Sequence, residues 1–226
     1  MVKEITIALA GNPNSGKTTV FNNLTGARQH VGNWPGVTVE KKEGSCRYQG
    51  YHIKVVDLPG VYSLTAYSPD EVIARNFIIE GKPDVVVDIV DASNLERNLY
   101  LVVQILEMGA PLIIALNMMD MAESKKYRID VSTLAQEIGA PVVPMVASRN
   151  RGTNELLEEL VNVFEGRGNN KKIRLYYGSE MEAHISELEA LISGDEELSR
   201  QFPPRWLAIK LLEEDKEILQ MIGGKL

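Results

Sequence analysis

A glycine-rich loop with the spacing G-x-x-x-x-G-K-T separates a strand pattern from a helix start near the N-terminus. In residues 3–9 the apolar side chains of Ile5, Ile7 and Leu9 alternate with smaller ones, which predicts a strand. Residues 19–24 follow the loop as the start of a helix. Glycines let backbone N–H groups converge on a phosphate, and the helix N-terminus adds the positive end of its dipole. The strand, loop and helix together predict a phosphate-binding site in an α/β sheet.

Strand patterns recur along the chain and alternate with helical ones. They are mostly continuous apolar runs, as expected for strands buried on both faces of a sheet, and lie at residues 51–56, 84–91, 111–117 and 141–146. Among the helical patterns between them, the one that starts at Ser68 has a capping serine and Pro69 at its first position. Strands that alternate with helices pair in parallel through right-handed crossovers. We therefore expect a three-layer α/β domain over residues 1–166.

The rest of the chain changes character after a polar cluster at residues 166–170. No strand pattern follows about residue 177. Ser179 and Glu182 form the capping-box pattern S-x-x-E, which predicts the start of a helix. A second helical segment is expected to open at Pro203. We expect residues 171–226 to form a small all-helical domain.

Composition limits the class of protein. The chain has 226 residues, and its 31 acidic and 24 basic side chains leave a formal net charge of −7. This balance disfavours a general binder of nucleic-acid phosphates. Cys46 is the single cysteine, so neither an internal disulfide nor a cysteine-based zinc site is expected. The sequence shows no signal-peptide pattern and no apolar run of the roughly 18 residues that a membrane helix needs, so we expect a soluble chain.

The phosphate loop carries specific chemistry at its C-terminal end. Lys17 supplies a positive charge for the outer phosphates, and Thr18 places a hydroxyl for a magnesium ion. All eight loop residues are expected to contact the nucleotide: Gly11, Asn12, Pro13, Asn14, Ser15, Gly16, Lys17 and Thr18.

Two further motifs discriminate between nucleotide classes. At the end of an apolar strand, residues 117–120 (NMMD) match the outer positions of the N-K-x-D pattern of guanine-nucleotide proteins. Asp120 can accept hydrogen bonds from the guanine N1–H and 2-amino groups, and adenine offers neither donor there. Residues 57–60 (DLPG) place Asp57 near the magnesium ion and the N–H of Gly60 toward the terminal phosphate. The expected contacts from these motifs are Asp57, Leu58, Pro59, Gly60, Asn117, Met118, Met119 and Asp120. The three motifs in this order predict a P-loop GTPase domain of Ras-like architecture that binds GTP and GDP.

The segment after the phosphate loop resembles a known family. Residues 24–40 (LTGARQHVGNWPGVTVE), together with the loop and residues 57–62 (DLPGVY), are similar to the N-terminal cytosolic part of ferrous iron transport protein B. The resemblance implies a GTPase domain, a helical regulatory domain and, in the complete protein, a membrane domain that carries Fe(II). The chain would then act at the cytoplasmic face of the cell membrane, with that membrane-embedded transport domain of the same polypeptide as its partner and without nucleic acid. Association with a second copy is left open.

The same resemblance assigns further site residues. It implies that Thr38 reaches the magnesium ion and the terminal phosphate once GTP is bound, and that Asn14 holds a potassium ion with backbone around Gly32 and Trp34. A cation there would offset charge that develops between the outer phosphates. The backbone N–H that reads guanine O6 is expected from Ala147, Ser148 and Arg149. The expected catalytic residues are Asn14, Lys17, Thr38 and Gly60, and the expected metal ligands are Thr18, Thr38 and Asp57 for magnesium and Asn14, Gly32 and Trp34 for potassium.

Two departures from the general GTPase pattern bear on mechanism. Val61 stands where many GTPases carry a glutamine that orients the attacking water, so hydrolysis is expected to be slow and stimulated by potassium. Met118 replaces the usual lysine of N-K-x-D, which helps to pack the base and tie the phosphate loop. Its absence predicts modest affinity and quick nucleotide release.

Several alternatives stay open at this point. A GTP-dependent module that binds RNA or ribosomes would share the motifs, but the acidic balance and the lack of a basic tail oppose it. A nucleotide kinase would share the loop, but the sequence has no arginine-rich lid segment. Trp34 either packs to pin its loop or contacts an effector or a membrane domain. The sequence leaves open whether the natural chain continues past Leu226 and whether GTP turnover drives or only gates transport.

Overall fold

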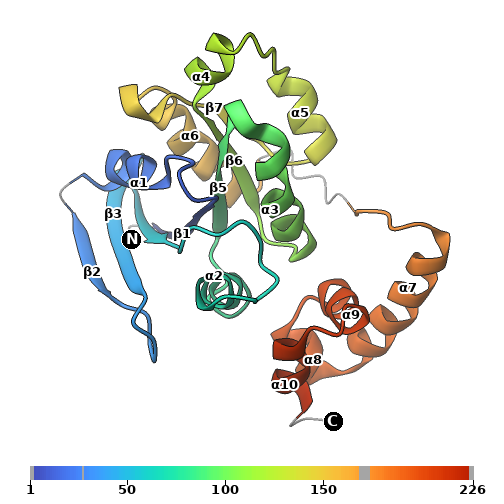
Figure 1. Cartoon of the computed structure of the whole chain (residues 1–226). Helices are drawn as coiled ribbons and strands as arrows, with labels where there is room; N and C mark the ends of the chain where they lie inside the picture. The colour runs from blue at the N-terminus through green and yellow to red at the C-terminus, as the bar shows by residue number, and fades with distance from the viewer. Residues whose placement is uncertain (1–2, 27, 168–173, 224–226) are drawn as a thin grey trace. The chain divides into compact units, whose positions relative to one another are not determined.

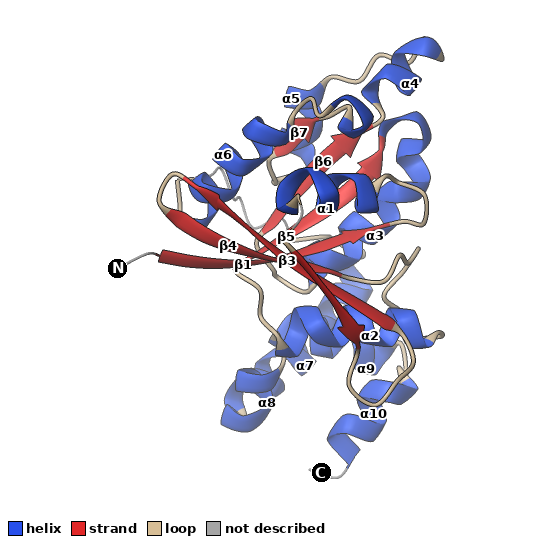
Figure 2. Cartoon of the chain, turned by 90° about the vertical axis from the view of Figure 1, so that its left-hand side faces the viewer, coloured by secondary structure: helices blue, strands red, loops and turns tan. Residues whose placement is uncertain are grey.

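The alternating patterns in the first part of the chain build a twisted sheet (Figures 1 and 2). A computed structural model describes residues 3–26, 28–167 and 174–223, and within them the sheet has seven strands. They are β1 (Lys3–Gly11), β2 (Gln29–Asn33), β3 (Glu40–Tyr48), β4 (Tyr51–Asp57), β5 (Val85–Asp91), β6 (Leu112–Asn117) and β7 (Val142–Pro144). Their order is β2-β3-β4-β1-β5-β6-β7. β1 and β4 to β7 run parallel, whereas β3 is antiparallel to both β2 and β4.

Helices cover both faces of the sheet, which confirms the three-layer α/β architecture. They are α1 (Lys17–Thr25), α2 (Pro69–Glu80), η1 (Ala92–Asn94), α3 (Leu95–Glu107), α4 (Met119–Ser124), α5 (Val131–Ile138), η2 (Ala147–Arg149) and α6 (Thr153–Phe164). Ile5, Ile7 and Leu9 of β1 are fully buried in a core with side chains of α1 and α6, such as Phe21 and Leu160. Each such side chain contributes roughly 1.5–3 kcal/mol by leaving water. The alternation of Ile5, Ile7 and Leu9 therefore determines which face of β1 these helices cover. Ser68 caps α2 as predicted, because its hydroxyl accepts the N–H of Glu71 at 3.3 Å.

The strands β2 and β3 are not predicted by the apolar patterns. β3 begins with charged residues, is only partly buried, and pairs with β4 in the register from Lys42 opposite Asp57 to Tyr48 opposite Tyr51. Every residue of β2 is exposed. Backbone hydrogen bonds to β4 and then to β3 form these strands, and their charged side chains are typical of a sheet edge that must not pair further.

The C-terminal part is helical, as predicted, over the residues that the structure describes there. Its helices are α7 (Ser179–Gly194), α8 (Glu196–Gln201), α9 (Pro204–Leu212) and α10 (Lys216–Gly223). Phe202 and Trp206 stack with ring centroids 6.1 Å apart, and Ile185 and Ile218 are fully buried. The apolar positions at helical spacing thus form the interior of this unit.

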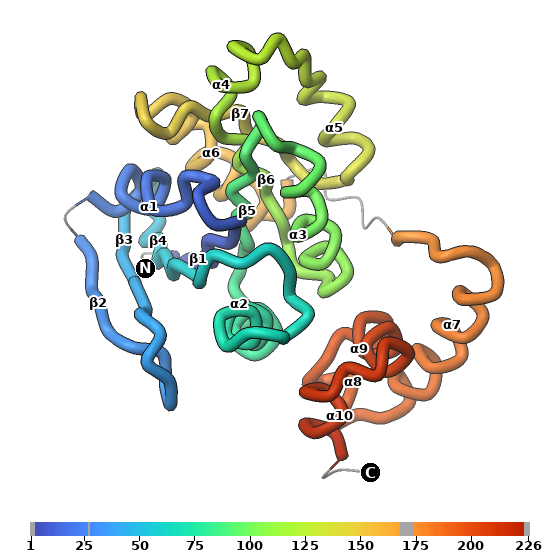
Figure 3. Tube along the Cα trace, viewed as in Figure 1, coloured from blue at the N-terminus to red at the C-terminus, as the bar shows by residue number. Residues whose placement is uncertain are grey.

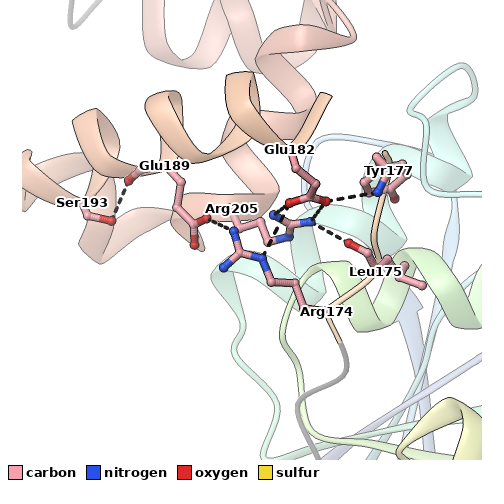
Figure 4. A network of polar contacts seen from close by, with 7 residues as sticks. All are labelled: Arg174, Leu175, Tyr177, Glu182, Glu189, Ser193 and Arg205. Carbon is pink, nitrogen blue, oxygen red and sulfur yellow. Dashed lines mark hydrogen bonds and ion pairs between the residues drawn. The ribbon is translucent and has the colours of Figure 1, made fainter. Parts of the chain in front are cut away.

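Glu182 has a different role from the predicted one (Figure 4). Its carboxylate accepts two hydrogen bonds from the Arg205 guanidinium, at 2.7 and 3.0 Å, and one from the backbone N–H of Tyr177 at 3.1 Å. Arg205 also donates to the Leu175 carbonyl at 2.7 Å. The predicted capping box at Ser179 is therefore wrong: α7 starts there without a side-chain cap, because bidentate charge-assisted bonds hold Glu182 on Arg205.

The chain divides into two compact units. Residues 3–106 and 110–167 belong to the α/β unit, and residues 107–109 and 174–223 to the helical one. The predicted boundary cluster reaches into residues 168–170, which lie outside the described residues, so the boundary between residues 166 and 171 stays a prediction. In the described ranges no helix is both long enough and apolar enough to cross a membrane.

Candidate functional site

The loop between β1 and α1 lies at the carboxyl edge of the parallel strands, where α/β sheets bind ligands. Gly11, Asn14 and Gly16 have φ angles of +153°, +66° and +94°, which most side chains disfavour. A Cβ atom at Gly16 would also collide with the side-chain amide of Asn117. Glycine is therefore required at position 16 both by the backbone conformation and by the close approach of β6. The loop ends at the N-terminus of α1, where free N–H groups favour an anion.

Lys17 and Asp57 join the start of α1 to the end of β4. The Lys17 ammonium lies 2.5 Å from the Asp57 carboxylate, and only 12% and 8% of the two side chains are exposed. Burial raises the pKa of Asp57, and the neighbouring Lys17 charge acts in the opposite direction. The pair brings together the lysine expected to meet phosphate and the carboxylate expected near magnesium.

The turn after Asp57 is attached to the phosphate loop by its backbone. The N–H of Leu58 donates to the Leu9 carbonyl at 3.0 Å, and the N–H of Val61 donates to the Gly11 carbonyl at 3.2 Å. A Cβ atom at Gly60 would lie 3.5 Å from the Pro13 Cα, so this glycine is packed directly beside the loop. The Val61 side chain is buried. The phosphate loop and the motif at residues 57–60 thus lie together in one structural site.

Asn117 connects the phosphate loop to the chain that follows β7. Its side-chain N–H group donates to the Ser15 carbonyl at 2.9 Å, and its side-chain oxygen accepts the N–H of Ala147, also at 2.9 Å. Asn117 is buried, so these bonds are shielded from water. The N-x-x-D motif and the Ala147 segment therefore lie at the phosphate loop, although 102 and 30 residues separate these partners.

Asp120 lies at the start of α4 and is partly exposed. One carboxylate oxygen accepts the N–H of Met121 at 3.0 Å, and the other lies 3.8 Å from the Arg149 guanidinium. The backbone of Met118 is left-handed, and its terminal methyl would lie 3.8 Å from a Cβ atom at Gly16. Met118 thus covers part of the phosphate loop by apolar contact where the usual lysine is absent.

The turn η2 contains the three residues expected to supply an N–H to guanine O6. The N–H of Ala147 is bonded to Asn117, and that of Arg149 donates to the Val146 carbonyl at 2.9 Å. The N–H of Ser148 has no hydrogen-bond acceptor among the described residues. Of the three predicted residues, Ser148 is thus the one whose N–H has no partner in the described part of the chain.

The segment with Gly32, Trp34 and Thr38 forms a hairpin of β2 and β3. Gly32 pairs with Lys41, and Thr38 is exposed in the turn. β2 is three strands from β1, which is about 14 Å at roughly 4.8 Å per strand. Figure 1 shows the turn of this hairpin well apart from α1. The structure therefore does not bring these three residues to Asn14.

Trp34 packs against α2. Its ring is buried and meets Phe77 edge to face, with centroids 5.5 Å apart, and the Lys41 ammonium lies 4.9 Å from the Trp34 centroid. The sequence left open whether Trp34 packs to pin its loop or contacts an effector or a membrane domain. The packing role describes this arrangement, because the indole holds the loop between β2 and β3.

The donor set of the site bears on which metal fits. The described residues include no group of three or more His, Cys, Asp or Glu side chains that could hold an ion. Thr18 follows Lys17 at the start of α1 and offers a hydroxyl, and Asp57 offers a carboxylate. Magnesium prefers such oxygen donors and is usually held by one or two of them together with phosphates and water. These residues fit magnesium bound with a nucleotide.

Two contacts of the site involve residues that no motif marks. Asn23 of α1 donates to the Ala147 carbonyl at 2.8 Å, and the ring of Phe77 in α2 packs against the Trp34 ring. Neither position has a spacing or composition signal, since packing between distant segments creates both contacts.

Comparison with known proteins places both units in one family. The family model described as ferrous iron transport protein B matches residues 5–160, and the model of the FeoB cytosolic helical domain matches residues 177–225. A Porphyromonas gingivalis protein named Fe(2+) transport protein A/Fe(2+) transporter FeoB fusion protein is 46% identical over 97% of this chain and 26% of its own. The Salmonella typhimurium Fe(2+) transporter FeoB is 47% identical over 95% of this chain and 28% of its own. The chain therefore spans about a quarter of the length of these relatives.

Solved structures resemble the whole fold. The cytosolic domain of the T. maritima FeoB iron transporter in a GDP form has a TM-score of 0.90 and 41% identity, with 96% of this chain and 85% of that chain covered. The same domain in its GMPPNP form has a TM-score of 0.89 and 41% identity, with 96% and 84% covered.

Proposed function

The chain belongs to the ferrous iron transport protein B family, and on that premise we propose that its α/β unit binds GTP and GDP and hydrolyses GTP in the service of Fe(II) transport. The observation that carries this proposal is the Asn117 side chain, which joins the Ser15 carbonyl to the N–H of Ala147. It thereby connects the loop suited to phosphates with the turn suited to a guanine base. The relatives solved in GDP and GMPPNP forms support the same nucleotide class.

The phosphate end of the site uses the start of α1. Backbone N–H groups of the phosphate loop and the Lys17 ammonium bind the phosphates, and Gly60 presents its N–H to the terminal one. Lys17 exchanges the Asp57 carboxylate for phosphate, which frees Asp57 for magnesium. Thr18 and Asp57 hold that ion, which neutralises charge on the outer phosphates when bound, and Thr38 joins them after its segment moves.

The base end uses the ends of β6 and β7. Asp120 accepts hydrogen bonds from N1–H and the 2-amino group of guanine, and Ser148 donates its N–H to O6. Met118 and Met119 provide apolar contact beside the base and the loop. Adenine satisfies neither Asp120 nor Ser148, so guanine is selected.

Asn14 is proposed to hold potassium beside the phosphates. Its exposed side chain offers an amide oxygen, and the backbone near Gly32 and Trp34 completes the set when the hairpin segment leaves its present place. Potassium then offsets charge that Val61 cannot relieve through an oriented water, since the valine side chain forms no hydrogen bond.

Hydrolysis of GTP is expected to be faster in potassium than in sodium, by on the order of tenfold, and Asn14→Ala is expected to remove the difference. Phosphate release from GTP and from ATP, measured in each salt, checks this and tests the proposed activity at the same time. Asn154→Ala changes an exposed asparagine on α6 and is the matched control. Equal rates in both salts would remove the potassium site, and faster release from ATP would remove the GTPase assignment.

Tryptophan fluorescence gives the same proposal an optical readout. In a Trp206→Phe background, Trp34 is the single tryptophan. Its emission is expected to move to longer wavelength when a GTP analogue and potassium are added together, because Trp34 leaves its buried contact with Phe77. An emission maximum that does not move would mean that the segment stays packed on α2.

The partner of this chain is proposed to be the membrane-embedded transport domain of the same polypeptide, at the cytoplasmic face of the membrane. Uptake of radioactive Fe(II) by cells whose only copy of the full-length protein carries Lys17→Ala is expected to fall to background, because the phosphates lose their main cation. Lys216→Ala, at an exposed position of α10, is the control and is expected to leave uptake unchanged. Full uptake with Lys17→Ala would contradict the link between nucleotide and transport.

A further inference from the structure

The backbone of Ala147 is held by asparagine side chains at both its N–H and its carbonyl group. Its N–H donates to the side-chain oxygen of Asn117 at 2.9 Å. Its carbonyl oxygen accepts the side-chain N–H of Asn23 at 2.8 Å and the backbone N–H of Asn150 at 3.0 Å. Both lone pairs of this carbonyl are therefore used, and Ala147 is buried. The N–H of Ser148 belongs to the same planar peptide group as this carbonyl, so its orientation follows from how the carbonyl is held.

The hydrogen bonds within η2 leave the orientation of the Ser148 N–H dependent on the segments that contact this turn. The turn contains three residues, and Asn150 follows in a left-handed conformation with φ +52°. A short turn of this kind has few hydrogen bonds of its own. Asn23 reaches it from α1, 124 residues away in the chain, and Figure 3 shows α1 beside the segment that follows β7.

The helix α1 spans the two ends of the proposed nucleotide site. Lys17 is its first residue and Asn23 lies six residues later, a rise of about 9 Å at roughly 1.5 Å per residue. Lys17 bonds to Asp57 at the proposed phosphate end, whereas Asn23 bonds to the turn η2 at the proposed base end. One rigid element therefore relates the phosphate end to the base end.

We propose that Asn23 is a positioning residue for guanine recognition, which holds the peptide group between Ala147 and Ser148 so that the Ser148 N–H faces O6 of the base. The inference rests on the proposed function, since it requires a guanine at this turn. Asn23 itself does not contact the nucleotide. Its effect should therefore appear only with bases that carry a good acceptor at position 6.

The test compares three nucleotides that differ at the base edge. GDP has O6 and the 2-amino group, IDP keeps O6 without that group, and 6-thio-GDP replaces O6 by sulfur, a weak acceptor. Asn23→Ala is expected to weaken GDP and IDP binding roughly five- to tenfold, and 6-thio-GDP binding by less than about twofold. Titrations that displace a fluorescent GDP analogue measure all three affinities.

Two further variants keep the result interpretable. Asn23→Asp has the same shape but turns an acceptor toward the Ala147 carbonyl, so the same pattern with a larger loss is expected. Asn22→Ala makes the same change at an exposed neighbour on α1, whose side-chain oxygen accepts from Gln29, and it is expected to show no dependence on the base.

Some outcomes would overturn the inference. Equal weakening of all three nucleotides by Asn23→Ala would give Asn23 a structural role only, and unchanged GDP binding would show that the contact does not position the turn. Failure of the proposed function is a separate result, in which the unsubstituted chain binds GDP no more tightly than ADP.

Discussion

Replacing Asp120 by asparagine is expected to move the nucleotide preference from guanosine to xanthosine diphosphate. The carboxylate accepts two donors from guanine, whereas an asparagine amide accepts from N1–H and donates to the 2-oxygen of xanthine. Hydrogen bonds to a charged group contribute about 1.5–3 kcal/mol, and a buried mismatch costs a similar amount. The ratio of GDP to XDP affinity is therefore expected to fall by a factor on the order of 10³.

Competition of GDP and XDP against a fluorescent nucleotide measures this ratio. Glu123→Gln makes the same change from acid to amide at an exposed position of α4, the helix that contains Asp120, and should leave the ratio unchanged. An Asp120→Asn chain that still prefers GDP would show that another group reads the base. The Arg149 guanidinium, 3.8 Å from Asp120, would then be the next residue to examine.

Replacing Asp88 by asparagine is expected to raise the folding stability of the α/β unit, relative to the unsubstituted chain, by more at pH 8 than at pH 5. Asp88 lies inside β5, only 1% of it is exposed, and neither carboxylate oxygen has a hydrogen-bond partner among the described residues. Burial raises the pKa of Asp88 from 3.8 to about 7. The folded state therefore holds a proton that the unfolded state releases between about pH 4 and 7, and folding stability is lost as the pH rises through this window. The asparagine has no proton to lose.

The size of this effect follows from the pKa difference. Between pH 5 and 8 the unsubstituted chain should lose about 2–3 kcal/mol relative to Asp88→Asn, which corresponds to roughly 5–10 °C in Tm. Thermal unfolding followed by circular dichroism at both pH values measures it. Asp70→Asn, at a partly exposed position of α2, is the control. If the Tm difference between Asp88→Asn and the unsubstituted chain is the same at both pH values, Asp88 does not titrate in this range.

The strands show what local pattern can and cannot predict. The patterns at residues 84–91 and 111–117 are mostly apolar because both faces of β5 and β6 are buried, and burial leaves a signal in the sequence. β3 has no such signal, because it is formed by backbone pairing with β4 while its side chains stay partly exposed. Ser179 and Glu182 show the converse error. Their local pattern is correct for a cap, but a guanidinium from α9 offers Glu182 a stronger partner.

The site divides in the same way. Gly16 and Asn117 could be found from motif spacing, because their contacts depend on short segments at the ends of neighbouring strands. Which N–H of residues 147–149 is left without a partner could not, since it depends on which N–H the Asn117 oxygen accepts. Asn23 belongs to no sequence motif, and only its contact with η2 identifies it as part of the site.

The sequence by itself determined the layered α/β fold, the phosphate loop and the order of the motifs at the carboxyl edge of the sheet. These features depend on periodicity and on residues close together in the chain, which have the same consequence in any context. Only the tertiary structure decided that the segment with Thr38 lies in an edge hairpin, that Trp34 is packed on Phe77, and that α1 holds the turn after β7. Those features are contacts between distant segments, and their free energies depend on the geometry that brings the segments together.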